Sequence, residues 1–114
     1  MSLRCVNRCA LIVKPRQPYA DWANGFDDDG PRFDLRYHRN NPTVFLITEP
    51  DDLENLDVAL KRHWRRIFEE QLSAWMRQPS DWPPRRTLTV FREWFDVTLS
   101  DLVLDLSRKY LEAE

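Results

Sequence analysis

Two short apolar runs rich in β-branched residues predict the strands of a sheet. Residues 9–13, Cys-Ala-Leu-Ile-Val, stop at a Lys-Pro pair and have the length and composition of a buried strand. Residues 43–48, Thr-Val-Phe-Leu-Ile-Thr, are apolar at successive positions, so both faces of this strand are apolar. A third alternation of apolar and polar residues covers 96–106 with an interruption at a Ser-Asp pair, and it fits either a strand or a helix.

Apolar residues spaced three and four positions apart predict three helices. A short helix covers residues 19–26, where an Asn-Gly pair gives a C-terminal stop signal. A long helix has Thr48 or Asp51 as its N-cap and ends near Arg77, because prolines crowd the connector that follows. A second short helix spans residues 88–95.

The segment between the first helix and the second strand is harder to assign. Residues 27–31, Asp-Asp-Asp-Gly-Pro, have the composition of a loop. Beyond them Phe33, Leu35 and Tyr37 alternate with polar residues, which predicts a short edge strand over 32–37. A single helical turn over the same residues is the alternative.

Together these elements predict an α/β fold of the α+β kind, built as a two-layer sandwich. A mixed sheet of three or four strands is covered on one face by the long helix and the two short ones. The 114 residues suffice for one domain, over 1–114, with residues 1–6 and 108–114 peripheral. Aromatic residues make up 12% of the chain, which is enough for a core that needs neither disulfides nor metal.

Charge and cysteine usage narrow the classes of function. The 17 basic and 19 acidic side chains give a net charge of −2, whereas dedicated nucleic-acid binders usually carry a strong cationic excess. No apolar run approaches the ~20 residues that cross a bilayer. Cys5 and Cys9 do not form a disulfide framework and fit reduced thiols. We therefore expect a cytoplasmic protein that binds neither nucleic acid nor membrane.

Three stretches of the chain form a familiar pattern: residues 7–19, residues 42–49, and Trp82-Pro83 with the aromatic residues and leucines that follow it. They resemble a family of small uncharacterised bacterial proteins with no established activity. The resemblance covers roughly residues 7–106 and carries no function over. In similar sequences the last segment is extended, which favours a strand over 96–106. The stretch 25–41 departs from the family pattern.

A search for catalytic and cofactor signatures yields none. Gly25 and Gly30 are the only glycines, which excludes phosphate loops and dinucleotide-binding fingerprints. The few cysteines and histidines lack the paired spacing of zinc ligands. The acidic run before Gly30 fails the spacing of an EF-hand loop, because Arg36 falls where the last ligand should stand. We expect no catalytic residue, no metal and no cofactor.

One candidate ligand site depends on the direction of the strands. If residues 9–13 and 43–48 form parallel neighbours, their carboxyl ends meet at one edge of the sheet, where α/β proteins bind ligands. Aromatic side chains and the connector after the long helix would add walls and a further cation. The residues of this predicted site are Lys14, Arg16, Trp22, Glu49, Trp82 and Arg86. The simpler interpretation, which we favour, is a structural ion pair of Lys14 with Glu49 and tryptophans that belong to the core.

Two functions remain open from the sequence. The first is a small non-enzymatic interaction module of the cytoplasm that binds a protein partner or itself. The apolar faces of 44–47 and the surplus of aromatics favour a homodimer as the form of self-association. The alternative is a small-molecule-binding protein or enzyme that uses the site at the strand ends.

Overall fold

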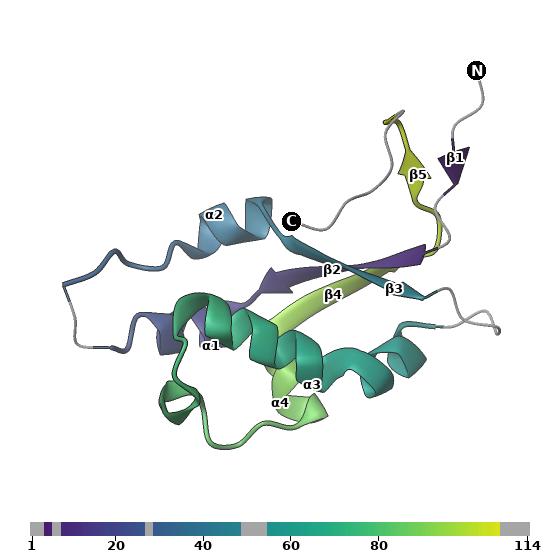
Figure 1. The fold of residues 1–114 in the computed structure, drawn as a ribbon. Helices are drawn as coiled ribbons and strands as arrows, with labels where there is room; N and C mark the ends of the chain where they lie inside the picture. The colour runs from purple at the N-terminus through teal and green to yellow at the C-terminus, as the bar shows by residue number, and fades with distance from the viewer. Residues whose placement is uncertain (1–3, 6–7, 27–28, 49–54, 108–114) are drawn as a thin grey trace.

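The structure is a computed structural model that describes residues 4–5, 8–26, 29–48 and 55–107. The described elements are β1 (Arg4–Cys5), β2 (Arg8–Pro15), α1 (Gln17–Ala23), α2 (Leu35–Asn40), β3 (Thr43–Thr48), α3 (Leu56–Trp75), the 3-10 turn η1 (Pro79–Asp81), α4 (Leu88–Trp94), β4 (Phe95–Ser100) and β5 (Leu104–Asp105). The α+β class is confirmed. A sheet forms one layer, and α1, α3 and α4 lie together on one side of it (Figure 1).

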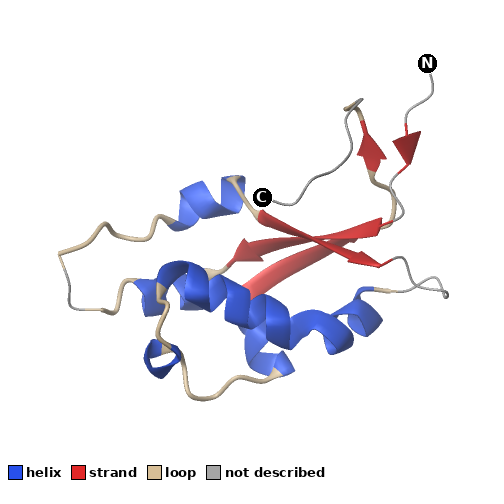
Figure 2. Ribbon diagram, in the orientation of Figure 1, coloured by secondary structure: helices blue, strands red, loops and turns tan. Residues whose placement is uncertain are grey.

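The main sheet has three strands in the order β3-β2-β4, with β2 in the centre. Both pairs are antiparallel, so the expectation of a mixed sheet is wrong in this respect. In register, Ile12 stands between Val44 of β3 and Thr98 of β4. A separate ladder joins β1 to β5 and projects from the body of the molecule (Figure 2).

The core lies between the sheet and the helices. Alternate residues of β2, Cys9, Leu11 and Val13, are buried and belong to one continuous apolar cluster. Alternation along a strand sends their neighbours to the opposite, outer face. From the helical layer Phe68 and Phe91 join the cluster with ring centroids 5.7 Å apart, in an edge-to-face arrangement. This packing fixes α3 lengthwise beneath the sheet.

The long helix begins later than the sequence pattern suggests. Asn55 is the N-cap, and its side-chain oxygen accepts a hydrogen bond from the Val58 amide at 3.1 Å. Of the two predicted caps, Thr48 is the last residue of β3 and Asp51 lies outside the described residues. An asparagine at this position satisfies one of the amides that a helix start leaves unpaired. The helix ends at Trp75, where the chain becomes extended, two residues before the predicted end.

The edge strand predicted over 32–37 is wrong, because the chain forms α2 there. Asp34 caps this helix by accepting a hydrogen bond from the Tyr37 amide at 3.2 Å. Phe33 precedes the cap, is buried in the core, and stacks on the His38 ring with centroids 4.3 Å apart. The alternation of apolar residues therefore reflects one anchoring phenylalanine and a short helix.

The strand predicted over 96–106 is confirmed, with the expected interruption. β4 ends at Ser100, and pairing resumes in β5 against β1. The core of the described residues is one cluster that includes residues of β2, β3 and β4 and of the helices. Of the residues predicted to be peripheral, 1–3, 6 and 108–114 lie outside the described residues.

Candidate functional site

The predicted ligand site does not form at one edge of the sheet. β2 and β3 are antiparallel, so Arg8 pairs with Thr48 at one end and Val13 pairs with Thr43 at the other. The carboxyl end of β2, with Lys14, therefore lies about 20 Å from the carboxyl end of β3, given a rise of about 3.4 Å for each residue. Glu49 itself lies outside the described residues.

Lys14 and Arg16 instead lie beside a different carboxylate, Asp96 of β4. Asp96 is the cross-strand neighbour of Lys14, and the Arg16 Nε lies 3.8 Å from its Oδ1. Arg39 of α2 approaches the other oxygen, Oδ2, at 2.9 Å and also donates to the Pro15 carbonyl at 2.9 Å. These side chains are about half exposed, so the ion pairs contribute little to stability individually. They join α2, β2 and β4 at this end of the sheet.

Trp22 and Trp82 serve the structure in the way that the simpler interpretation expects. Both rings pack against the core. The Trp22 indole donates to the Asp81 carbonyl at 3.0 Å, and the Trp82 indole donates to the Met76 carbonyl at 2.8 Å. A partly buried indole N–H needs such an acceptor. The two tryptophans thus hold the connector that follows α3 against the rest of the fold.

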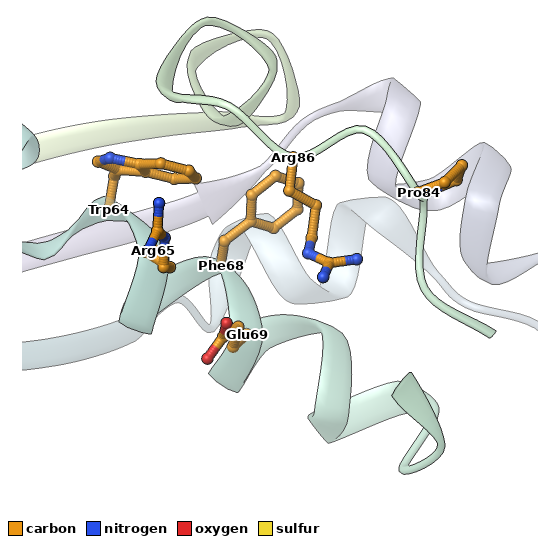
Figure 3. A pocket seen from close by; sticks show the side chains of 6 residues that line it. All are labelled: Trp64, Arg65, Phe68, Glu69, Pro84 and Arg86. Atoms are coloured by element: carbon orange, nitrogen blue, oxygen red, sulfur yellow. The ribbon is translucent and has the colours of Figure 1, made fainter. Parts of the chain in front are cut away.

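The remaining residue of the predicted site, Arg86, lines a cleft between α3 and this connector (Figure 3). The cleft has a volume of about 290 Å³ and is lined by Trp64, Arg65, Phe68, Glu69, Pro84 and Arg86. The Arg86 guanidinium lies 5.5 Å from the centre of the Trp82 ring and donates to the Pro83 carbonyl at 2.7 Å. Two guanidinium groups beside aromatic rings suit a planar anion.

A larger groove, which the sequence analysis missed, follows the strand β3. Its volume is about 430 Å³. It is lined by Phe45, Leu46, Ile47 and Thr48 of β3 and by His63, Arg66, Ile67 and Glu70 of α3. The spacing of the four helical positions, which places them on one side of α3, was visible in the sequence. What the sequence could not supply was the position of β3 at the edge of the sheet.

The outer face of the sheet carries exposed apolar side chains next to this groove. Val44 is 51% exposed and Leu46 is 48% exposed. Their register partners on β2, Ile12 and Ala10, continue the apolar surface inward. None of the three helices α1, α3 and α4 lies on this face (Figure 1).

Two groups have clearly shifted acidities. Burial raises the pKa of the Tyr19 hydroxyl well above its usual range, and this hydroxyl donates to the Gln71 carbonyl. Burial, and then the charges of Arg62 and Arg66, lower the pKa of His63 in the groove. The positive charges along this side of α3 therefore disfavour a further proton on His63.

The described residues form neither a metal-binding cluster nor a membrane-spanning helix. No group of three His, Cys, Asp or Glu side chains gathers there closely enough to hold a metal ion. None of the described helices has the length and apolar character needed to span a bilayer.

No family model, curated protein or solved structure matches the chain.

Proposed function

We propose that this protein is a small non-enzymatic interaction module that binds a protein partner on the β3 side of its sheet. The observation that carries the proposal is the exposure of Val44 and Leu46 on a strand at the edge of the sheet. Natural proteins usually protect such strands with charged residues, prolines or bulges, or cover them with another element. The sequence of Thr43–Thr48 contains no charged residue and no proline.

A separate partner fits this surface better than an obligate homodimer. Obligate homodimers bury ~2,000 Å² or more of mainly apolar surface. Among the described residues of the three-stranded sheet, the apolar side chains of the outer face are Val44 and Leu46 of β3 and their partners Ala10 and Ile12 of β2, and the far end of the sheet carries the charged residues Lys14 and Asp96. Self-association is thus the alternative outcome of the tests below.

The proposed place of action is the cytoplasm. The cysteine content supports this part of the proposal, because the chain has 2 cysteines and Cys9 is a buried core residue. Domains that depend on disulfides in oxidising compartments carry many more cysteines for their size.

Site-specific photo-crosslinking in the protein's own host tests the proposal. A photoreactive phenylalanine analogue replaces Leu46 in one variant and the exposed Ser80 of η1 in the control. The expected result is an adduct at position 46 with one identified protein. This protein, once purified, should bind the wild type and fail to bind Leu46→Asp. Equal labelling from both positions, or a purified partner that binds Leu46→Asp as well as the wild type, would overturn it.

A second function is favoured by the cleft of Figure 3, in which Arg65 and Arg86 accompany Trp64 and Phe68. This geometry supports binding of a small planar anion, so the small-molecule alternative moves from the strand ends to this cleft. Titration with benzoate, followed by tryptophan fluorescence, tests it. We expect a saturable change that Arg86→Ala abolishes; a linear, non-saturating response in the wild type would exclude this function.

A further inference from the structure

The groove beside β3 lies along the outer edge of the strand. Four consecutive residues, Phe45 to Thr48, line it, although successive side chains of a strand point to opposite faces of the sheet. A groove that touches residues of the inner face and residues of the outer face must lie along the edge of the strand. Within the described part of the chain, β3 pairs only with β2, so its other edge offers backbone N–H and C=O groups to this groove.

An edge of this kind binds extended peptides by adding them to the sheet as a further strand. The main-chain hydrogen bonds supply affinity, and the alternate side chains of the peptide supply specificity. The four residues of β3 that line the groove span about 13 Å, which matches a peptide segment of about four residues. On the outer face, its side chains would lie beside Val44 and Leu46, where apolar cross-strand pairs stabilise a sheet.

The helical side of the groove favours a negatively charged ligand. Ile67 is buried, whereas Arg66 is exposed beside it. Arg62 adds a second positive charge one turn earlier on α3, and its effect reaches His63. No described carboxylate lies within ion-pair distance of Arg62 or Arg66. Among the described residues that line the groove, Glu70 is the single acidic one, so Arg62 and Arg66 give the described part of this side of α3 a positive balance.

We infer that the groove binds an acidic extended segment of a partner protein, which joins the sheet beside β3 as a fourth strand. Glutamates on the inner face of this segment cover Ile67 with their methylene groups and bring their carboxylates to Arg66. Small β-branched residues on its outer face cover Val44 and Leu46. The inference rests on the proposed function and specifies the chemistry of the partner.

A second copy of this chain is a poorer occupant of the same groove. The strand β3 carries no carboxylate, so it offers nothing to Arg66. A twofold axis through paired β3 strands would also place both α3 helices on the same side of the joined sheet. Their positive sides would then face each other, which is unfavourable for charges of like sign.

Binding of synthetic heptapeptides, measured by fluorescence anisotropy on the full chain, tests the inference. The probe alternates valine and glutamate and is blocked at both ends. One matched control replaces glutamate with lysine, and another carries N-methyl groups on alternate amides, which prevents strand pairing. We expect the glutamate peptide to bind at least about tenfold more tightly than either control, because both charge and backbone contacts are needed.

Two variants of equal charge change locate the site on α3. Arg66→Glu should weaken binding of the glutamate peptide about tenfold, because attraction becomes repulsion. Arg65→Glu is the control, since Arg65 lines the cleft on another side of α3. Circular dichroism verifies that both variants are folded. Equal losses in the two variants would overturn the location of the site.

The outcomes separate this inference from the proposed function. If the glutamate and lysine peptides bind equally, the acidic preference is wrong. If none of the peptides binds although crosslinking at position 46 identifies a partner, strand addition is wrong and the interaction module stands. If none of the peptides binds and crosslinking also fails, both proposals are wrong.

Discussion

Removal of the Tyr19 hydroxyl tests how the helical layer is held together. Tyr19 is 3% exposed, and its hydroxyl links α1 to α3 by donating to the Gln71 carbonyl at 2.5 Å. Its ring also contacts aromatic side chains from several segments, namely Trp22, Phe33, Trp94 and Phe95. Tyr19→Phe keeps these ring contacts and deletes only the hydrogen bond.

The expected loss of stability near neutral pH is about 1 kcal/mol, the net value of one buried hydrogen bond. The loss stays near this value because the Gln71 carbonyl also accepts from the Trp75 amide in the regular α-helical pattern, so it is not left without a partner. For a chain of this size, the same loss lowers the melting temperature by about 4 °C.

The difference in stability between the wild type and Tyr19→Phe should change sign at high pH. Burial raises the pKa of Tyr19 in the folded state, whereas the unfolded chain releases this proton near its usual pKa of about 10. The wild type therefore loses about 1.4 kcal/mol of stability for each pH unit above that value. Tyr19→Phe has no such proton, so the two stabilities should become equal between about pH 10.5 and about pH 11.

Urea unfolding at about pH 8 and about pH 11 measures both effects. Tyr37→Phe is the matched control, since Tyr37 is 57% exposed and its substitution should leave the stability unchanged. A difference between wild type and Tyr19→Phe that stays constant over this range would refute the argument. It would mean that the hydroxyl is not held protonated by burial in the folded protein.

Three further predictions concern other contacts. Burial and two neighbouring arginines lower the pKa of His63 in the folded state, so the unfolded chain takes up the His63 proton first as the pH falls. Urea titrations should therefore show that the wild type loses more stability than His63→Gln when the pH falls from about 7 to about 5. Asp96→Asn, which breaks the ion pair with Arg39, should cost under about 1 kcal/mol in thermal melts, and about 1 M salt should remove the difference. Trp82→Phe, which loses the hydrogen bond to Met76, should lower the urea midpoint by the equivalent of about 1 kcal/mol.

Local patterns predicted most elements because local forces determine them. The strand at 43–48 has the predicted bounds, since a β-branched run between prolines has few alternatives. The start of the long helix was harder to predict, because residues 48–55 include several residue types that cap helices, and the structure has the cap at Asn55. Over 32–37 the apolar alternation favoured a strand, whereas the chain forms the helix α2 with Asp34 as its N-cap.

The direction of β3 could not be predicted from local patterns. A helix between two strands suggests a parallel crossover. However, α1 has 7 residues and is about 10 Å long, whereas the 8 residues of β2 extend over about 26 Å. The helix is thus too short to return the chain to the start of β2. The chain enters β3 near the end at which it left β2, after passing through α2 (Figure 1).

The positions of the candidate sites depend on the direction of β3 relative to β2. Antiparallel pairing separates Lys14 from the end of β3 and leaves Asp96 as its neighbour. The groove beside β3 could not be found either, because its two walls come together only when β3 lies at the edge of the sheet above α3. Arg86 was expected to add a cation to a site at the strand ends, whereas in the structure it lines the cleft between α3 and the connector.

An NMR titration of the labelled protein with the valine-glutamate peptide tests the central claim most directly. We predict that the amides of Thr43–Thr48 and of α3 residues 63–70 shift most, and that the β3 amides become protected from hydrogen exchange. Shifts concentrated on Arg86, which lines the cleft, and on Trp82 beside it, with β3 unchanged, would contradict this prediction and would place the binding site in the cleft between α3 and the connector.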